Sequence, residues 1–423
     1  MSQVCVIGMG YVGLTLAAAF AKKGHDVIGV ERSKELVAKI NSSQVPFVDQ
    51  GLEETLQMVL KDSKLTITSS LDEISATFDF VIIAIGTPIS EKLHTDISNF
   101  SDIPSQLEGH ISPNCVVILR STIPVGTTRM LGEMFRSKGL NVDVSFCPER
   151  TVEGIALNEL FVLPQIVSGE NATSLENVTE LFLSITPDIV PVTNLETAEL
   201  VKLCSNMWRD YTFAFSNELF RLTRNFTIDV HELINAANHN YLRNQIPKPG
   251  GVGGPCLTKD TYIFNQSIGN MENIFTHARE VNAGFPKEVA RVLRQRDLVT
   301  GNVGICGWAF KGNPPTSDIR FTPTLEIFKE VASFSQTEKF YGWDPEPINV
   351  SELPGNLEYV GNFADLLPIC DTLIIANNHP FFSSQIFVEM IEETKKPLTL
   401  IDLWNVVPNL KNITNHVVTL GSL

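Results

Sequence analysis

Residues 4–13 read "VCVIGMGYVG", a short run of β-forming residues that enters the pattern G-x-G-x-x-G. The segment that follows, "LTLAAAFAKKG" (14–24), is rich in helix-forming residues and ends at a glycine, as is typical of a helix with its stop signal. A second β-rich run, "DVIGV", occupies residues 26–30. The glycines of the pattern are Gly8, Gly10 and Gly13. The order of strand, glycine turn, helix and strand predicts a dinucleotide-binding β–α–β unit.

The residues around this turn match what a bound dinucleotide requires. The glycines allow a tight turn and a close approach of the pyrophosphate, and Tyr11 and Val12 lie where a helix N-terminus attracts its negative charge. Glu31 follows the second run, where a carboxylate binds ribose hydroxyls and repels a 2′-phosphate, so NAD is favoured over NADP. The adjacent Arg32 could accommodate that phosphate, which keeps NADP open. A glycine turn with a purely structural role is the alternative.

Three more apolar runs follow, at 78–88, 114–126 and 142–149, and each ends in polar or turn residues. Ligands of an open α/β sheet lie beyond the carboxyl ends of its strands. The polar residues at these ends are Thr87, Thr122 and Glu149. We therefore expect them near a ligand, although each could equally serve only to end a strand.

The stretch "CPERTVEG" (147–154) carries two carboxylates, Glu149 and Glu153, four positions apart. If this stretch turns helically, both side chains share one face and could act together. Spacing alone fits a solvated acidic surface at least as well, so the pair stays open at this point.

A long helix is predicted from Thr193, where Thr193 and Glu196 fit a capping box. The apolar residues of the segment recur with helical period and form one stripe, namely Leu200, Leu203, Cys204, Met207, Trp208 and Tyr211. Such a stripe is typical of a packing or dimer element. Lys202 and Asn206 fall on another face, where they could be ordinary surface residues or part of a site.

Residues 250–260 read "GGVGGPCLTKD", four glycines in five positions before a cysteine. Such a loop can expose backbone N–H groups around Cys256, and Lys259 supplies a nearby cation, which favours a reactive thiol. The alternative is a small buried residue. That alternative fits the other strand cysteines well, namely Cys5, Cys115, Cys306 and Cys370.

After about residue 300 a second α/β pattern begins. Its predicted strands are 302–310, 338–346, 371–378 and 398–404, and a helix over 276–296 precedes them. The predicted fold class is α/β, with two Rossmann-like doubly wound domains joined by a helical middle domain that has a long central helix. The expected boundaries are 1–190 for the NAD-binding domain, 191–298 for the middle domain and 299–423 for the last domain.

Charge and composition exclude several classes of protein. The net charge of −16 lacks the basic footprint of a nucleic-acid binder. The chain has no signal-peptide pattern and no apolar run of the roughly 18 residues that a membrane span needs, so we expect a cytoplasmic location without a membrane partner. Seven scattered cysteines fit a reducing compartment. No C-x-x-C or H-E-x-x-H spacing is present, and we expect no metal site.

Taken in order, the motifs of this chain resemble those of the UDP-glucose/GDP-mannose dehydrogenase family over nearly its whole length. The motifs that carry the resemblance are "GMGYVG", "TP" at 87–88, "STIPVGTT", "CPERTVEG", "TAELVKLCSNMWRD", "PGGVGGPCLTKD" and "GWAFKGNPPTSDIR". The resemblance implies a four-electron oxidation of a sugar C6 alcohol to a carboxylate with NAD, in surface polysaccharide synthesis. "CPER" and "KLCSNMWRD" look more like the branch that acts on UDP-N-acetylhexosamines, above all UDP-N-acetylmannosamine, than like UDP-glucose dehydrogenases.

The resemblance also implies roles for single residues. Cys256 matches the nucleophile that forms a thiohemiacetal and then a thioester, a form of covalent catalysis. Lys202 and Asn206 match the pair that stabilises the oxyanion. Asp260 matches an aspartate that moves a proton or positions water. Thr122 with Glu149 matches the water-holding acid–base group.

Further residues match binding roles in the family. The implied cofactor contacts beyond the glycine turn are Thr87, Thr122, Glu153, Lys259 and Arg320. The implied substrate contacts are Glu149, Arg150, Lys202, Asn206, Gly250, Gly253, Phe310 and Lys311. Arg243 resembles an arginine that reaches the substrate of a neighbouring subunit, which implies a homodimer or a higher homo-oligomer.

Departures from the family pattern leave the sugar open. The run from Arg243 to Cys256 is one residue shorter than in the N-acetylmannosamine branch, and Phe321 stands where an acid is usual. Lys259 and Glu153 are retained as in glucose enzymes, so UDP-glucose remains an alternative substrate. A two-electron hydroxyacid dehydrogenase and a non-catalytic nucleotide-sugar binder are the remaining alternatives.

Overall fold

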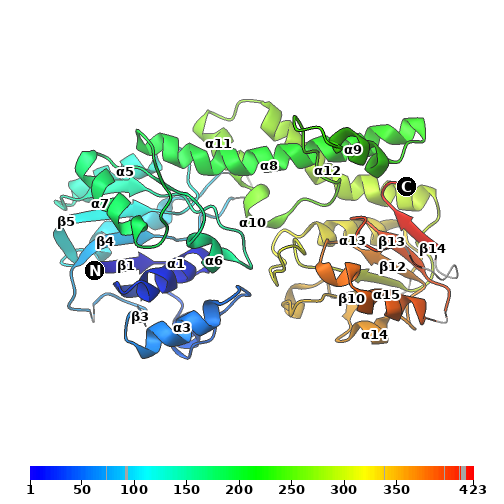
Figure 1. The fold of residues 1–423 in the computed structure, drawn as a ribbon, viewed down its shortest axis with the longest axis horizontal. Helices are drawn as coiled ribbons and strands as arrows, with labels where there is room; N and C mark the ends of the chain where they lie inside the picture. The colour runs from blue at the N-terminus through cyan, green and yellow to red at the C-terminus, as the bar shows by residue number, and fades with distance from the viewer. Residues whose placement is uncertain (73, 91–93, 338, 395, 409, 411–415) are drawn as a thin grey trace. The chain divides into compact units, whose positions relative to one another are not determined.

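The structure, a computed structural model, divides the chain into two compact units. It describes residues 1–72, 74–90, 94–337, 339–394, 396–408, 410 and 416–423. Unit 1 comprises Met1–Ser205 and Tyr262–Met271, and unit 2 comprises Asn206–Thr261 and Glu272–Leu423. Each unit is built on one parallel sheet, and Figure 1 follows the chain through both.

Unit 1 contains a six-stranded parallel sheet in the order β3-β2-β1-β4-β5-β6. Its strands are β1 (Gln3–Ile7), β2 (Asp26–Val30), β3 (Leu65–Thr68), β4 (Phe78–Ile83), β5 (Ile111–Leu119) and β6 (Asp143–Phe146). A separate parallel pair joins β7 (Gln165–Val167) to β8 (Ile189–Pro191). The strands of the large sheet are near-continuous apolar runs because helices cover both of its faces.

The helices of unit 1 form two layers around this sheet. One layer packs on Val4, Val6 and Ile82, and the other packs on Cys5, Val81 and Val117. The first layer comprises α1 (Tyr11–Lys22), α2 (Lys34–Asn41), α3 (Leu52–Lys61), α6 (Ala156–Leu160) and α7 (Ala172–Leu183). The second comprises η1 (Ser98–Phe100), α4 (Ile103–Gln106), α5 (Thr127–Ser137) and the start of α8.

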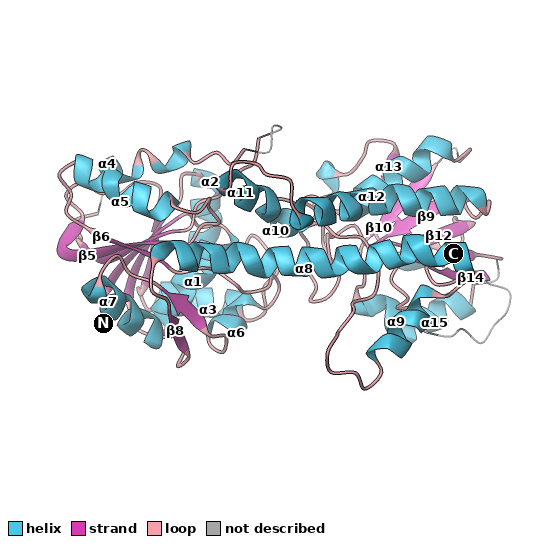
Figure 2. Cartoon of the chain, turned by 90° about the horizontal axis from the view of Figure 1, so that it is seen from above, coloured by secondary structure: helices cyan, strands magenta, loops and turns pink. Residues whose placement is uncertain are grey.

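The long helix α8 (Leu195–Thr223) belongs to unit 1 at its start and to unit 2 from Asn206 onward. Figure 2 shows it as one continuous helix. The predicted cap is wrong by one residue, because the Oδ1 of Asn194 accepts the Thr197 N–H at 2.8 Å and Thr193 takes no part in this bond. The predicted apolar stripe divides into a buried side and an exposed side. Leu203 and Met207 are buried, whereas Leu200, Cys204 and Trp208 are exposed.

Unit 2 contains a second six-stranded parallel sheet, in the order β11-β10-β9-β12-β13-β14. Its strands are β9 (Val303–Cys306), β10 (Phe340–Trp343), β11 (Leu357–Tyr359), β12 (Thr372–Ile375), β13 (Thr399–Asp402) and β14 (His416–Thr419). Its helices are η2 (Arg224–Phe226), α9 (Val230–Asn238), α10 (Gly254–Leu257), α12 (Ile274–Gln295), α13 (Pro323–Phe334), η3 (Val350–Glu352), α14 (Phe363–Leu366), η4 (Pro380–Ser383) and α15 (Gln385–Glu392). A further helix, α11 (Asp260–Ser267), starts in unit 2 and continues in unit 1.

The core of unit 2 also has two layers. Helices α9, α12 and α13 pack on the face that presents Ile305 and Ile374, while α14, η4 and α15 pack on the face of Cys306 and Ile375. The predicted α/β class, the two parallel sheets and the long central helix are therefore confirmed. The predicted strands correspond to β9, β10, β12 and β13, although Glu338 at the start of one prediction lies outside the described residues. Sequence patterns missed β3, β7, β8, β11 and β14, which are short strands at sheet edges or in the separate pair.

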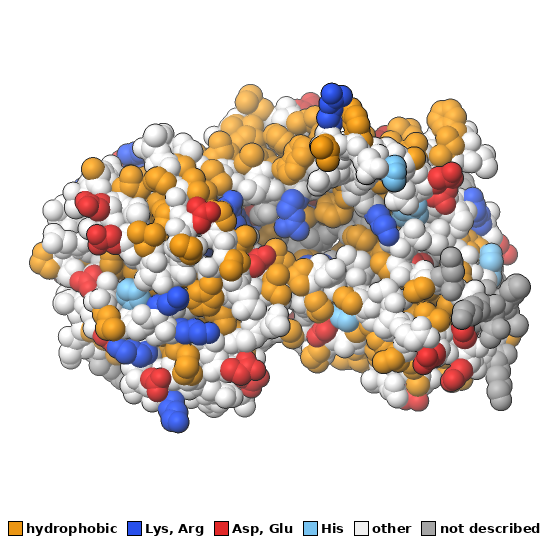
Figure 3. All heavy atoms as spheres, viewed as in Figure 1, with side chains coloured by type: hydrophobic (Ala, Val, Ile, Leu, Met, Phe, Trp, Pro, Cys, Tyr) orange, Lys and Arg blue, Asp and Glu red, His pale blue; other side chains and the backbone are white. Residues whose placement is uncertain are grey.

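The surface carries charges of both signs. On the face drawn in Figure 3, acidic and basic side chains are interspersed rather than gathered into one block. Among the described residues, no helix is long and apolar enough to cross a membrane.

Candidate active site

The glycine turn of unit 1 joins β1 to α1 and has the geometry of a dinucleotide cradle. Gly8 has φ +95°, a conformation that favours glycine, and its N–H donates to Val30 O at 2.8 Å. A Cβ on Gly13 would lie 1.8 Å from the Gly8 carbonyl oxygen, so this position requires glycine. A Cβ on Gly10 would meet nothing within 4 Å. The open space beside Gly10, at the N-terminus of α1, fits an approaching pyrophosphate.

Glu31 lies beside the same turn. Its carboxylate accepts the N–H of Met9 at 3.0 Å and the N–H of Ser33 at 3.0 Å. These bonds hold the acid at the end of β2, where a ribose-binding carboxylate is expected. Arg32 is exposed, and Tyr11 and Val12 form the half-buried first turn of α1.

Tyr11 connects the glycine turn to the loop 147–154. Its hydroxyl donates to Asp49 Oδ2 at 2.5 Å and accepts the Gly154 N–H at 2.6 Å. Burial and the neighbouring Asp49 raise the pKa of Tyr11 far above its usual value. The stretch from Glu149 to Glu153 is not helical, so the argument that spacing four places both carboxylates on one face does not apply.

Glu149 is buried and held by an arginine that the sequence argument did not single out. Arg120 donates to Glu149 Oε2 from Nη2 at 2.8 Å and from Nε at 3.1 Å. Its Nη1 donates to Gln165 Oε1 at 3.0 Å and to Cys147 O at 3.1 Å. The signal was available, because Arg120 follows the apolar run "NCVVIL" directly and a buried arginine needs a carboxylate partner.

The charge of Glu149 follows from these neighbours. Burial alone would raise the pKa of this carboxyl, but the positive charges of Arg120 and Lys202 and the N–H of Thr151 outweigh burial and hold the pKa below its usual range. Glu149 is therefore held in its anionic form, which can accept a proton, although the lowered pKa makes it a weaker base than an ordinary carboxylate.

Other predicted residues of unit 1 lie at strand ends, as expected. Thr87 is buried after β4, and its hydroxyl donates to Thr122 O at 2.6 Å, which ties the segments after β4 and β5 together. Arg150 donates to Pro164 O at 2.5 Å. Glu153 and Lys202 are half-buried.

In unit 2, Cys256 is an exposed residue of the short helix α10. The neighbouring glycines are needed because other parts of unit 2 occupy the space of their side chains. A Cβ on Gly250 would lie 2.7 Å from the Trp404 ring, and a Cβ on Gly253 would lie 2.3 Å from Phe321 O. A Cβ on Gly251 would meet Pro323 at 2.7 Å, and one on Gly254 would meet the Phe310 ring at 2.4 Å. The glycine loop is therefore packed tightly against the rest of unit 2.

Two predicted catalytic residues are joined by a buried hydrogen bond. Asn206 Nδ2 donates to Asp260 Oδ2 at 2.6 Å, and both side chains are more than 90% buried. Lys259, half-buried, lies between Cys256 and Asp260 in the chain, and its N–H donates to Cys256 O at 3.1 Å. The structure thus joins Asn206 to Asp260 by a hydrogen bond. Cys256, four residues before Asp260 in the chain, is exposed.

The remaining predicted site residues of unit 2 are Arg243, Arg320, Phe310 and Lys311. Arg243 is exposed and lies over the Tyr241 ring at 5.6 Å. Arg320 is exposed and pairs with Asp318 at 2.5 Å. Phe310 and Lys311 follow β9, with the Lys311 ammonium 5.7 Å from the Phe310 ring centre.

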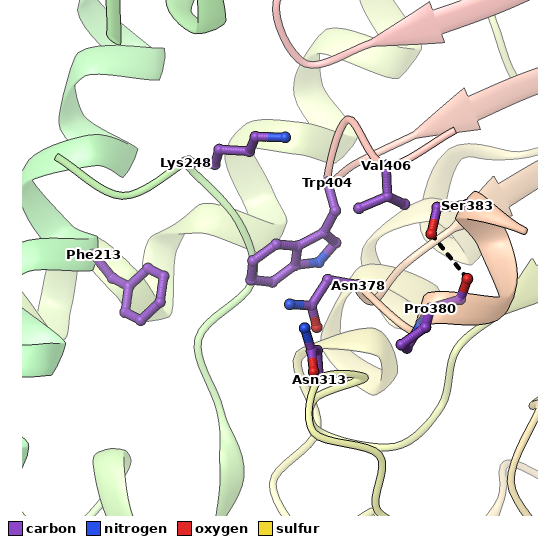
Figure 4. A pocket seen from close by; sticks show the side chains of 8 residues that line it. All are labelled: Phe213, Lys248, Asn313, Asn378, Pro380, Ser383, Trp404 and Val406. Atoms are coloured by element: carbon purple, nitrogen blue, oxygen red, sulfur yellow. Dashed lines mark hydrogen bonds between the residues drawn. The ribbon is translucent and has the colours of Figure 1, made fainter. Parts of the chain in front are cut away.

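A cavity of about 370 Å³ lies at the carboxyl ends of β9, β12 and β13 in unit 2. Figure 4 shows its lining, which comprises Phe213, Lys248, Asn313, Asn378, Pro380, Ser383, Trp404 and Val406. The Trp404 indole is fixed by its Nε1–H, which donates to Ala376 O at 2.9 Å, and Lys248 Nζ donates to Asn405 O at 3.0 Å. The sequence argument missed this set, although Trp404 ends a predicted strand, which is the position where ligands are expected.

Comparisons with known proteins agree with this architecture. Three domain models of the UDP-glucose/GDP-mannose dehydrogenase family match in order, namely the NAD-binding domain over 2–186, the central domain over 196–284 and the UDP-binding domain over 304–409. A UDP-N-acetyl-D-mannosamine dehydrogenase of Campylobacter jejuni is 32% identical over 373 residues, which cover 84% of this chain and 89% of that protein. One from Pyrococcus horikoshii is 29% identical and covers 96% of each chain.

Solved structures give the same answer at the level of fold. A UDP-D-ManNAc dehydrogenase from Pyrococcus horikoshii superposes with a TM-score of 0.84 at 27% identity, covering 99% of each chain. A UDP-glucose dehydrogenase from Pyrobaculum islandicum gives 0.86 at 24% identity, covering 100% of this chain and 98% of the other. The family models and the Campylobacter relative show that this chain belongs to the UDP-glucose/GDP-mannose dehydrogenase family, as a nucleotide-sugar dehydrogenase with an NAD-binding domain.

Proposed function

We propose that this chain oxidises the C6 alcohol of a UDP-N-acetylhexosamine, most specifically UDP-N-acetylmannosamine, to the uronate for surface polysaccharide synthesis. The observation that carries the proposal is the exposed Cys256 thiol, held on a tightly packed loop four residues before the buried Asp260–Asn206 pair. The UDP-N-acetyl-D-mannosamine dehydrogenases among its relatives support this sugar. UDP-glucose is the alternative substrate.

The chemistry proceeds in two oxidations and one hydrolysis. NAD, when bound at the glycine turn, supplies the acceptor for each hydride. The first oxidation takes a hydride from C6 and a proton from its hydroxyl, leaving an aldehyde. Cys256 Sγ bonds to the aldehyde carbon as its S–H bond breaks, and the oxyanion takes up that proton to give a thiohemiacetal. The second oxidation takes the remaining hydride and the hydroxyl proton, leaving a thioester. Water then breaks the C–S bond and releases the acid and the thiol.

Each step assigns work to residues of this chain. Lys202 and Asn206 lie one turn apart on α8, and as donors to the developing oxyanion each would contribute roughly 2–4 kcal/mol. The ionised Glu149, with Thr122, accepts the proton of the attacking water. Asp260 exchanges protons with the substrate oxygen, and its bond with Asn206 fixes its orientation.

The proposed substrate site lies at the carboxyl ends of the strands that border the cavity. We propose that the nucleotide occupies the cavity at β9, β12 and β13, with the Trp404 indole against the base and the Lys248 charge near the diphosphate. Phe310, Lys311, Gly250, Gly253 and Arg150 complete the proposed substrate set. Thr87, Glu153, Lys259, Arg320 and Arg32 are retained as proposed cofactor contacts.

A homodimer is proposed from the exposed apolar side of α8. Its residues recur at intervals of four or seven positions, which is one or two helical turns, and are exposed, namely Leu200, Cys204, Trp208, Phe215 and Leu222. In such a dimer Arg243 would serve the partner's substrate. The three-part division at 1–190, 191–298 and 299–423 is retained as a proposal, supported by the three family matches.

The test is the yield of NADH at 340 nm with limiting UDP-N-acetylmannosamine, UDP-N-acetylglucosamine, UDP-N-acetylgalactosamine and UDP-glucose. We expect two NADH per molecule of one UDP-N-acetylhexosamine. The Cys256→Ala variant serves as the control and is expected to lose the second NADH. One NADH per sugar in the unmodified protein would instead support a two-electron dehydrogenase, and two NADH per sugar from Cys256→Ala would mean that the oxidation does not pass through a Cys256 thioester.

A further inference from the structure

Four buried polar side chains lie together between α8 and α12 in unit 2. They are Asp210 and Asn217 on α8, and Arg279 and Asn282 on α12. Each is exposed by 4% or less. A buried polar group without a hydrogen bond costs roughly 1–3 kcal/mol, and within this set only Asp210 Oδ2 has no partner among the described residues. We call this set the α8–α12 network.

The members of the network bond to one another. Arg279 Nη1 donates to Asp210 Oδ1 at 2.7 Å, and Asn282 Nδ2 donates to the same oxygen at 2.8 Å. Asn217 Nδ2 donates to Asn282 Oδ1 at 2.8 Å. Burial raises the pKa of the Asp210 carboxyl, against the opposing effects of Arg279 and Asn282.

Two members also hold the backbone of the cysteine loop. Asn217 accepts the Gly250 N–H at 2.9 Å and donates to Gly250 O at 3.1 Å. Arg279 donates to Val252 O at 3.3 Å and to Leu257 O at 3.4 Å. These contacts lie on both sides of Cys256, so the network fixes the loop before and after the thiol.

The hydrogen bonds of the network indicate a role in addition to joining the two helices. Two helices can be joined as well by apolar side chains, and replacing a buried ion pair by well-packed apolar residues is often neutral or stabilising. Here Asn217 and Arg279 direct donors at loop carbonyls. A guanidinium suits this task, because its planar fork can bond a carboxylate and backbone carbonyls at once.

We propose that Arg279 and Asn217 are positioning residues that hold Cys256 where its sulfur captures the aldehyde before the aldehyde can leave. This inference rests on the proposed function. Neither residue touches the reacting atoms; both act through the loop backbone. A displacement of about 1 Å at a reacting group can cost about 100-fold in rate, so a loosened loop gives the aldehyde time to escape.

The experiment measures directly how much of the aldehyde intermediate leaves the protein. The Arg279→Lys variant keeps the charge beside Asp210 but loses the fork, and Asn217→Ala removes both bonds to Gly250. The matched control is Arg224→Lys, because Arg224 also pairs with a carboxylate of α12, at 2.7 Å from Glu288, but belongs to η2. Each protein receives limiting UDP-sugar, excess NAD and hydroxylamine, which converts a released aldehyde to an oxime and water.

We expect two NADH per sugar and little oxime from the unmodified protein and from Arg224→Lys. For Arg279→Lys and Asn217→Ala we expect the yield to fall toward one NADH, with oxime in matching amount. A second readout needs no turnover, namely the rate of Cys256 alkylation by iodoacetamide relative to that of N-acetylcysteine in the same solution, followed by mass spectrometry. This ratio should change in the two positioning variants only.

Two results would overturn the proposal. One is a yield of two NADH with hydroxylamine and an unchanged alkylation ratio in a folded Arg279→Lys or Asn217→Ala protein. The other is equal oxime formation by Arg224→Lys, which would mean that the network has only a structural role. If Arg279→Lys does not fold, Asn217→Ala alone decides. One NADH from the unmodified protein would reject the proposed function instead, which separates the two failures.

Discussion

The two sheets of this molecule begin in the same way. In unit 1, Gly8 follows β1, has φ +95° and donates its N–H to Val30 O at 2.8 Å. In unit 2, Gly307 follows β9, has φ +90° and donates its N–H to Trp343 O at 3.0 Å. The strand orders correspond as well, with the first strand of each sheet beside the second and the fourth. The second sheet therefore repeats the scaffold of the first.

The correspondence extends to the acid after the second strand. Glu31 accepts the N–H of Met9, the residue after Gly8, and Asp344 accepts the N–H of Trp308, the residue after Gly307, at 2.5 Å. Asp344 also accepts the Ala309 N–H at 2.9 Å and is only 4% exposed. Glu31 is half-buried and can meet a ligand, whereas Asp344 serves its own backbone.

The two sheets differ in what lies beside the start of the helix that follows the glycine turn, α1 in unit 1 and α13 in unit 2. After Gly8 the helix α1 begins at once, and the space beside Gly10 is open. After Gly307 the chain makes an excursion over 309–321 before α13 begins at Pro323, where Gly251 and Gly253 of the cysteine loop lie against that proline. Gly10 thus leaves open space at the start of the helix in unit 1, whereas Gly251 and Gly253 let the loop that carries Cys256 pack against the start of α13 in unit 2.

The largest expected effect tests the crowded glycines. In Gly253→Ala the new Cβ would lie 2.3 Å from the backbone oxygen of Phe321 and 2.6 Å from Cδ of the Pro323 ring, which is bonded to the backbone nitrogen, so neither atom can move easily. We expect a loss of about 3 kcal/mol in the free energy of unfolding and, because the thiol moves, about 100-fold in kcat. Urea unfolding followed by tryptophan fluorescence measures the first, since all four tryptophans belong to unit 2.

The control for Gly253→Ala is Gly361→Ala, in the same unit, where a Cβ would meet nothing within 4 Å. It should keep both the stability and the activity of the parent. Equal behaviour of the two variants would mean that the loop adjusts freely, and the explanation of its glycines by packing would then be wrong.

The open glycine of unit 1 should respond in the opposite way. In Gly10→Val the side chain enters the space expected for the pyrophosphate, so NAD affinity should fall about 100-fold, equal to about 2.8 kcal/mol, while the melting temperature stays unchanged. Calorimetric titration with NAD and a thermal melt measure the two quantities on one sample. A lower melting temperature with unchanged affinity would show that unit 1 uses its glycines for packing, as unit 2 does, and would remove the contrast.

The contrast between the two turns also shows how much of the fold could be predicted from the sequence. The first sheet was predicted through its glycine turn, because the spacing of Gly8, Gly10 and Gly13 and the acid at 31 are local signals. The second Rossmann-like sheet was predicted from its strand pattern, but its turn carries only Gly307 and its helix begins after a long excursion, so no local glycine motif indicated where that turn lies. The glycines before Cys256 were visible in the sequence, but their partners Trp404, Pro323 and Phe321 lie 68 or more residues away and only the fold identifies them.

The candidate site was predictable to a similar extent. The family resemblance indicated Asn206 and Asp260, and the fold joins them. It did not indicate Arg279, because a positively charged residue in a helix is expected on the surface until its buried carboxylate partner is known. It did not indicate Arg120 either, although the position of this residue directly after a buried apolar run was a usable signal. Charge pairs that depend on long-range contacts are the part of a site that sequence patterns convey least.

The smallest expected effect concerns the acids of the two turns. Burial raises the pKa of Asp344 from 3.8 to about 6, opposed by the N–H groups that it accepts. As pH rises from about 4 to 6, the unfolded chain ionises this acid while the folded protein retains the proton, so the free energy of unfolding of unit 2 should fall by roughly 2–3 kcal/mol. Urea unfolding at pH 4, 5 and 6 measures this slope.

The Asp344→Asn variant has no group to titrate, so its slope over this range should be shallower than that of the parent protein, while the exposed Asp365→Asn should keep the parent slope. Asp344→Asn should also be less stable at every pH, because its amide places N–H groups against the backbone donors that the carboxylate accepted. An unchanged slope in Asp344→Asn would mean that Asp344 is ionised when folded. Burial would then not be enough to keep the proton on Asp344, and the expected pH dependence of unit 2 would be wrong.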